Sequence, residues 1–212
     1  NLQLTGSFKV RGAGFMISQL SKEEKEKGVI ACSAGNHAQG VALAAQKYGI
    51  KAVICLPDGA PISKVEATKS YGAEVCLVEG VYDDAYNKAL SLRDEMGYSF
   101  IHPFDDPDVI AGQGTIALEL IEQMSEMDAV IVPIGGGGLI SGIAYTAKQI
   151  RPSIKIYGVQ AAGAPSMANS VRNGKIEELP SVSTIADGIA VKTPGTLTYE
   201  MCQKYVDEIV TV

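Results

Sequence analysis

The sequence predicts an α/β fold in which parallel sheets are flanked by helices. Two observations carry this prediction. The chain has 212 residues, 46% of them apolar, which is enough to build the core of one large domain or two small ones. Short β-branched runs also alternate with longer amphipathic stretches, and the loops between them are marked by Gly, Pro or Asp. Repeated alternation of this kind is typical of parallel sheets covered by helices.

The individual elements follow from local patterns. The strands are expected where apolar, β-branched residues run together, at residues 29–32, 52–56, 74–78, 129–132, 155–159 and 208–212. The helices are expected where small or apolar residues recur at helical spacing, at residues 36–48, 63–71, 83–96, 115–124 and 140–150. The mixed-sign cluster at residues 22–27 indicates a solvated helix end.

Composition excludes several classes of function. The formal net charge of −6 has the wrong sign for a surface that neutralises nucleic-acid phosphates. The most apolar stretch, residues 129–144, contains Pro133 and four glycines, so it is too broken to span a membrane. Cys32, Cys55 and Cys76 lie in apolar runs without a CxxC pair, which indicates buried thiols, a reducing, cytoplasmic compartment and neither disulfide nor zinc.

The two ends of the sequence suggest a piece of a longer chain. Residue 1 is Asn1, without an initiator Met or a leader, and the last residues, 207–212, form an apolar run with nothing after it to cover it. We therefore expect the chemistry described below to belong to a longer parent protein.

Four consecutive glycines, Gly135, Gly136, Gly137 and Gly138, separate an expected strand from an expected helix. Backbone N–H groups at such a helix start can converge on an anion without interference from side chains. A phosphate cradle is the favoured interpretation, and a flexible turn is the alternative. A dinucleotide site would need an acidic residue after the next strand, where Gln160 stands, and a Walker loop would need a Gly-Lys-Ser/Thr triplet that is absent here.

Two further segments carry polar groups at expected helix starts. Lys9 stands between Phe8 and Val10, where partial burial would lower its pKa as an amine nucleophile requires, although a solvated lysine is the common alternative. Residues 31–40 lead from a strand through Ser33 and Asn36 into a helix. That loop suits a substrate carboxylate, and a plain N-cap at Ser33 or Asn36 is the alternative.

The order of these segments resembles one enzyme family. Ser-Phe-Lys-x-Arg-Gly-Ala is followed by Ser-Ala-Gly-Asn-His-Ala-Gln-Gly, Ala-Gly-Gln-Gly-Thr at 111–115, the tetraglycine loop, and Ala-Asp-Gly at 186–188. Over the whole chain this series resembles the threonine ammonia-lyase (threonine dehydratase) branch of the fold-type II pyridoxal-phosphate enzymes, which also contains serine racemase and serine dehydratase. The resemblance implies a tryptophan synthase β-like fold. Its larger cofactor domain would comprise residues 1–30 and 109–212, truncated at both ends, and its smaller mobile domain residues 31–108.

The resemblance also implies roles for individual residues. Lys9 would hold pyridoxal 5′-phosphate covalently and then serve as the base that removes the substrate's Cα proton. The remaining cofactor contacts would be Phe8 beside the ring, Asn36 at the 3′-oxygen, Gly135, Gly136, Gly137, Gly138 and Leu139 at the phosphate, and Gly188 near the ring. The substrate carboxylate would be received by Ser33, Ala34, Gly35, Asn36 and His37.

The implied activity is elimination from L-threonine or L-serine, giving 2-oxobutanoate or pyruvate and ammonia, in isoleucine biosynthesis or threonine catabolism. The expected partners are these small amino acids, with no nucleic acid and no membrane, and the full-length parent is expected to be a homo-oligomer. Three alternatives stay open: a serine racemase-like enzyme, a catalytically incompetent fragment of the lyase, and a nucleotide-binding regulatory module.

Departures from the family pattern bear on that choice. Racemases of the group carry a serine where this chain has Ala34, which has no proton to give. Gln160 and Ser166 stand where some members have acidic metal ligands, so no metal site is expected. The segment that would pair with the pyridine nitrogen is absent. For His37, bonding to nearby backbone and contact with substrate are equally plausible, and His102 is interpreted as structural.

Overall fold

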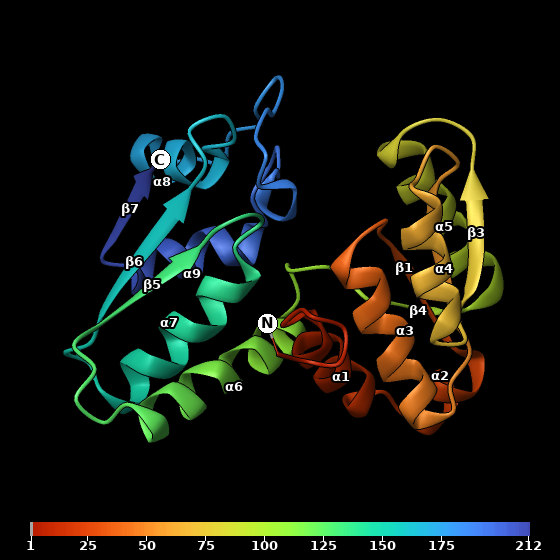
Figure 1. Ribbon diagram of the computed structural model, residues 1–212, viewed down its shortest axis with the longest axis horizontal. Coiled ribbons are helices and arrows are strands. Elements are labelled where there is room, and N and C mark those ends of the chain that lie inside the picture. The colour runs from red at the N-terminus through yellow and green to blue at the C-terminus, as the bar shows by residue number, and fades with distance from the viewer. Residues whose placement is uncertain (1) are drawn as a thin grey trace. The chain divides into compact units, whose positions relative to one another are not determined.

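The computed structural model describes residues 2–212. The chain divides into two compact units, the first ending at Pro103 and the second comprising Phe104–Val212 (Figure 1). Within residues 2–212, no helix has both the length and the apolar character needed to cross a membrane.

The first unit is a parallel sheet covered on both faces by helices. Its strands lie in the order β3, β2, β1, β4, and every pair is parallel. In chain order its elements are α1 (Lys9–Gln19), α2 (Lys22–Lys27), β1 (Val29–Cys32), α3 (Asn36–Tyr48), β2 (Ala52–Pro57), α4 (Ile62–Ser70), β3 (Glu74–Val78), α5 (Tyr82–Met96) and β4 (Ser99–Phe100).

Alternate residues of β1 face two different cores. Val29 and Ala31 pack with residues of α1 and α3 on one face of the sheet, whereas Ile30 and Cys32 pack with residues of α5 on the other. All four residues are buried, as expected for a central parallel strand with helices on both faces. The loop that follows β1 is therefore fixed at its start by two cores.

The second unit has a smaller parallel sheet in the order β5, β6, β7. Its core joins that sheet to residues of α7, α8 and α9. In chain order its elements are α6 (Pro107–Gln123), β5 (Ala129–Pro133), α7 (Gly138–Ile150), β6 (Lys155–Gln160), α8 (Ser166–Asn173), the 3-10 turn η1 (Asp187–Ile189), α9 (Thr196–Tyr205) and β7 (Glu208–Thr211).

The α/β fold with parallel sheets is confirmed, and each expected strand is present within one residue of its predicted ends. Helix α6 begins at Pro107 rather than at residue 115, because Asp106 accepts hydrogen bonds from the N–H groups of Asp108 and Val109 and so caps the earlier start. The elements β4, α8 and α9 were not predicted from the sequence. The division into a larger domain of residues 1–30 and 109–212 and a smaller one of residues 31–108 stays a prediction.

Helices α6 and α7 pack through glycines. A Cβ added to Gly142 would lie 2.6 Å from the backbone nitrogen of Gly114 and would also overlap the Ile110 carbonyl oxygen. Both obstacles are backbone atoms, which cannot rotate away as a flexible side chain would. The backbones of the two helices therefore approach more closely than any larger residue permits.

Replacing Gly142 with Ala should lower the free energy of unfolding by about 1–3 kcal/mol, because the added methyl group must push the two helices apart. Gly14→Ala is the control, since a Cβ at Gly14 meets nothing within 4 Å and removing a helical glycine is expected to be neutral or stabilising by about 0.5–1 kcal/mol. Urea unfolding of both variants measures the difference. Equal midpoints for the two variants would contradict the close approach of the helices.

Candidate functional site

Lys9 is the first residue of α1, directly after Phe8. Its Nζ donates a hydrogen bond of 2.6 Å to the carbonyl oxygen of Pro103 and lies 5.6 Å from the centre of the Phe8 ring. Burial disfavours the charged ammonium form and lowers the pKa of Lys9 to about 8. The chain thus provides an amine that changes protonation close to neutral pH.

The start of α1 is held in place by helix α3. A Cβ added to Gly40 would lie 3.0 Å from both the carbonyl carbon of Lys9 and the backbone nitrogen of Val10. Residues of the two helices, including Ala13 and Val41, share one buried cluster. The glycine therefore lets the α3 backbone pack directly against the residue that carries the amine.

The loop between β1 and α3 contains the other predicted residues of this unit. The N-cap of α3 is Gly35, and Asn36 is the first helical residue, so neither Ser33 nor Asn36 is the plain N-cap. The Ser33 hydroxyl instead accepts a hydrogen bond of 3.1 Å from the Gly35 N–H. Ala34 packs on the core formed with α1. The helix start is thus left without a side-chain cap, as a loop that receives an anion requires.

His37 is buried in the first turn of α3. Its Nε2 lies 2.8 Å from the carbonyl oxygen of Ile101, which can only accept, so Nε2 carries the proton. Burial, with a further contribution from the charge of Lys9, lowers the pKa of His37 to about 3, so the ring is neutral. Its buried Nδ1 has no hydrogen-bond partner within the described chain. The hydrogen-bond partner of His37 Nε2 is thus a backbone carbonyl distant in the sequence, and Nδ1 is an unused acceptor within the described chain.

The tetraglycine loop in the second unit connects β5 to α7. Within residues 2–212, the structure records no hydrogen bond from the backbone N–H groups of Gly135, Gly136, Gly137 or Gly138. A Cβ added at Gly135 would lie 3.1 Å from Ile189 Cα, at Gly136 2.5 Å from the Phe104 ring, at Gly137 2.7 Å from Thr198 Cβ, and at Gly138 2.9 Å from Phe104 Cα. Gly137 also has a φ of +100°. The side of the loop on which Cβ atoms would lie is therefore filled by neighbouring residues, and the loop is not a flexible turn.

The remaining predicted residues of this unit lie beside the loop. A Cβ added to Gly135 would lie 3.5 Å from the carbonyl oxygen of Gly188, so that glycine borders the loop. Leu139 is the second residue of α7 and packs against the core of the unit. The second unit thus gathers its predicted residues at the start of one helix.

Gln160 and Ser166 have structural partners. The buried Gln160 side chain donates to the Ile134 carbonyl at 3.3 Å and accepts from the Ala168 N–H at 2.8 Å. The Ser166 hydroxyl donates to the Val191 carbonyl at 2.8 Å. The neutral residues at these positions therefore brace the segment before the tetraglycine loop and the start of α8.

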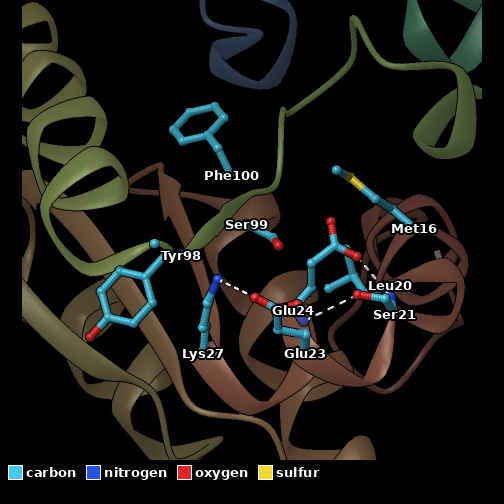
Figure 2. Close-up of a pocket in the computed structure, with 10 residues that line it drawn as sticks. Met16, Leu20, Ser21, Glu23, Glu24, Lys27, Tyr98, Ser99 and Phe100 are labelled. Carbon is cyan, nitrogen blue, oxygen red and sulfur yellow. Dashed lines mark hydrogen bonds and ion pairs between the residues drawn. The ribbon is translucent and has the colours of Figure 1, made fainter.

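A cavity of about 640 Å³ also occurs in the first unit, between α1, α2 and the segment around β4. Its charged side chains have partners within the cavity wall: Lys27 pairs with Glu23 at 2.8 Å, and Glu24 forms a capping box with Ser21 (Figure 2). None of the predicted site residues lines this cavity.

The fold and these loops define a parallel α/β protein with a desolvated lysine at one helix start and, at another, a glycine loop whose N–H groups have no partner within the described residues. The chain belongs to the family of pyridoxal-phosphate dependent enzymes, whose family model matches residues 1–212.

Three known proteins illustrate the similarity. An L-threonine ammonia-lyase of Thermotoga maritima is 54% identical over the whole chain, which covers 53% of that relative. The structure of threonine deaminase isoform 2 from Solanum lycopersicum superposes with a TM-score of 0.97 at 47% identity, over all of this chain and 62% of the other. Maize serine racemase gives 0.96 at 44% identity, over all of this chain and 64% of the other. The chain thus spans about half the length of the first of these relatives.

The residues of each unit fit a bound pyridoxal phosphate. Unpaired N–H groups at the start of α7, in a loop where every Cβ would be obstructed, suit a phosphate dianion. An amine with a pKa of about 8 suits covalent attachment to an aldehyde. Thr198 and Phe104 contact the tetraglycine loop, and Asp105 accepts hydrogen bonds from the first turn of α9. None of the three was identified from the sequence, and no local pattern marks them.

Lys9 should react with an amine-selective reagent at a rate that rises with pH through about 8 and levels off above it, because only the neutral amine is nucleophilic. The same lysine in the urea-unfolded chain should still be gaining reactivity near about pH 10, because its amine is then solvated. Mass spectrometry of peptides from the unliganded chain, labelled between about pH 6 and pH 11, measures both profiles. Identical profiles for Lys9 in the folded and the unfolded chain would contradict the burial of its amine.

Proposed function

We propose that the protein to which this chain belongs is a pyridoxal-phosphate dependent L-threonine/L-serine ammonia-lyase. The observation that carries the proposal is the desolvated Lys9 amine within the Ser-Phe-Lys segment. The similarity to proteins named threonine ammonia-lyase and threonine deaminase supports it. The substrate would be L-threonine, giving 2-oxobutanoate and ammonia, or L-serine, giving pyruvate and ammonia.

Each loop has one task in this proposal. The N–H groups of Gly135 to Gly138, with Leu139, hold the phosphate, and Gly188 borders the ring. Lys9 attaches the cofactor, Phe8 lies beside it, and Asn36 contacts its 3′-oxygen. The loop of Ser33, Ala34, Gly35 and His37 receives the substrate carboxylate at the uncapped start of α3.

When bound, pyridoxal phosphate supplies an electron sink for negative charge at the substrate's α-carbon. Lys9 handles the proton: its pKa of about 8 allows the amine to accept the Cα proton near neutral pH. In the overall reaction the β-hydroxyl takes up a proton and leaves as water, and one water then hydrolyses the C=N bond of the released imine to give the keto acid and ammonia. The Pro103 carbonyl accepts a hydrogen bond from Nζ, so it would orient the amine whenever Lys9 is not attached to the cofactor.

The setting of the enzyme is part of the same proposal. Residues 31–108 would form a mobile domain that closes over the substrate and excludes water, and residues 1–30 and 109–212 would belong to the cofactor domain. The four cysteines described are free thiols, which supports a reducing, cytoplasmic location. The full-length protein would be a homo-oligomer acting on free amino acids.

A serine racemase is the second candidate, because the maize serine racemase structure is also closely similar. Racemisation requires an acid that returns a proton to the opposite side of the α-carbon. Ala34 occupies the position at which racemases of the group carry that serine, and its methyl group has no proton to give. The lyase is therefore the better supported activity.

Incubating the chain with pyridoxal phosphate should produce a visible absorption band that borohydride removes, leaving the cofactor fixed on Lys9 in a peptide map, because the amine reacts with aldehydes near neutral pH. Lys9→Ala should lose the band. In the full-length parent the same substitution should reduce formation of 2-oxobutanoate from L-threonine by at least about 10³-fold.

Lys22→Ala is the matched control, since this lysine is solvated, and it should keep both the band and the activity. Normal turnover by Lys9→Ala would overturn the proposal. A band in the parent but none in this chain would show that the chain lacks parts of the cofactor site. A band in neither would contradict the cofactor assignment.

Ala34→Ser in the full-length parent should introduce weak racemisation of L-serine, because a hydroxyl would then stand where racemases have theirs. Chiral chromatography after prolonged incubation measures D-serine. Ala34→Gly, which adds no proton donor, should stay at the background of the unsubstituted protein. An unchanged D-serine level in Ala34→Ser would count against the assignment of this position.

A further inference from the structure

The tetraglycine loop is held from the second unit's own interior by a buried hydroxyl. Thr198 is fully buried in the first turn of α9. Its Oγ1 donates a hydrogen bond of 2.6 Å to the carbonyl oxygen of Gly136 and lies 3.2 Å from that of Gly195. A hydroxyl has one proton, and the shorter contact identifies Gly136 as its principal acceptor.

The orientation of one carbonyl determines the orientation of the next N–H group. The C=O of Gly136 and the N–H of Gly137 belong to the same planar trans peptide group, so they point in opposite directions. With the carbonyl directed at Thr198, the Gly137 N–H is directed away from α9. That N–H makes no hydrogen bond within the described chain, so it is available to an anion at the start of α7.

Asp105 fixes the helix that carries this hydroxyl. Its carboxylate accepts hydrogen bonds from the N–H of Thr196 at 2.9 Å and from the N–H of Thr198 at 3.0 Å. These are N–H groups of the first turn of α9, so the carboxylate caps that helix. It also leaves no room for a side chain at Gly195, where a Cβ would lie 2.6 Å from Asp105 Cβ. The first turn of α9 is therefore anchored where Thr198 meets the loop.

Phe104, the residue before Asp105, packs against the tetraglycine loop. The Phe104 ring fills the space next to Gly136, and its backbone fills the space next to Gly138. Phe104 and Asp105 are consecutive, so one dipeptide both packs against the loop and caps the helix that holds it. A shift of the Gly136 peptide would have to break the Thr198 bond and a longer bond of 3.4 Å from the Gly195 N–H, or displace an aromatic ring.

We propose that Thr198 is a positioning residue of the phosphate cradle: its hydroxyl holds the Gly136 carbonyl so that the Gly137 N–H stays directed at a bound phosphate ester. Asp105 supports Thr198 by capping α9. Without the hydroxyl, the Gly136 carbonyl keeps only the longer hydrogen bond of 3.4 Å from the Gly195 N–H. The Gly136–Gly137 peptide is then less firmly held, and glycine tolerates other orientations. The proposal rests on the phosphate-binding part of the proposed function.

The experiment measures phosphate binding at the glycines themselves, without requiring activity. The ¹⁵N-labelled chain is titrated with pyridoxine 5′-phosphate, which has no aldehyde to react with lysines, and with pyridoxine as the ligand that lacks the phosphate. Saturable shifts of the Gly135 to Gly138 amide signals are expected with the phosphate ester only. Thr198→Val, which keeps the shape and removes the hydroxyl, should weaken this binding about tenfold. Thr198→Ser should bind within about threefold of the unsubstituted chain.

Two controls separate the hydroxyl from general effects on stability. Thr68→Val makes the same change at a buried threonine of the first unit, whose hydroxyl donates to the Lys64 carbonyl at 2.9 Å, and should leave phosphate binding unchanged. Asp105→Asn removes the charge of the partly buried cap and should weaken binding about threefold. It tests the anchor even if Thr198→Val does not fold.

The outcomes distinguish this proposal from the function it builds on. Unchanged affinity in Thr198→Val or in Asp105→Asn, or equal weakening in Thr198→Val and Thr198→Ser, would overturn the positioning role while the cradle stands. Glycine signals that respond to no phosphate ester in the unsubstituted chain would overturn the cradle and this proposal together. Mapping of the cofactor to Lys9 tests the enzyme assignment separately.

Discussion

A helix start binds an anion only if its backbone N–H groups are unpaired and yet fixed in direction, and this requirement governs the second unit. Unpaired N–H groups are costly when buried. Within the described residues, those of the tetraglycine loop make no hydrogen bond that would fix their direction. The order comes from outside, from the Phe104 ring, Met167 and the Thr198 hydroxyl, all of which occupy space that a Cβ would need. Glycine at each position therefore serves packing as much as access to the anion.

In the first unit the energetic cost comes from a buried charged group, the ammonium of Lys9. An ammonium group held out of water destabilises the fold, and burial lowers the pKa of Lys9 to about 8. Because the folded chain then binds fewer protons than the unfolded one, stability is lower below about pH 8 and rises as the pH increases toward the ordinary lysine pKa of about 10.5. The Pro103 carbonyl and the close approach of Gly40 hold the amine in spite of this cost. Reactivity is thus obtained at the expense of stability.

The sequence predicted features that depend on local pattern and missed those that depend on distant contacts. Strand β1 was predictable because four apolar residues are bounded by polar ones, and the tetraglycine loop because its composition is unusual. Strand β4 has two residues, too few for a period. Helix α9 is short and polar, and its cap is Asp105, 93 residues before Thr198. No sequence pattern distinguishes Thr198 from other threonines, because its role depends on a hydrogen bond to Gly136, 62 residues away.

Four residues of the segment 101–105 make contacts that hold the loops of their own unit. In the first unit the Ile101 carbonyl fixes the proton of His37, and the Pro103 carbonyl accepts from Lys9. In the second unit Phe104 packs against the tetraglycine loop, and Asp105 caps the helix that holds it. Each contact stays within its own unit, but the backbone between them is continuous. The backbone of this segment is therefore restrained on both sides of the division by hydrogen bonds and close packing within each unit.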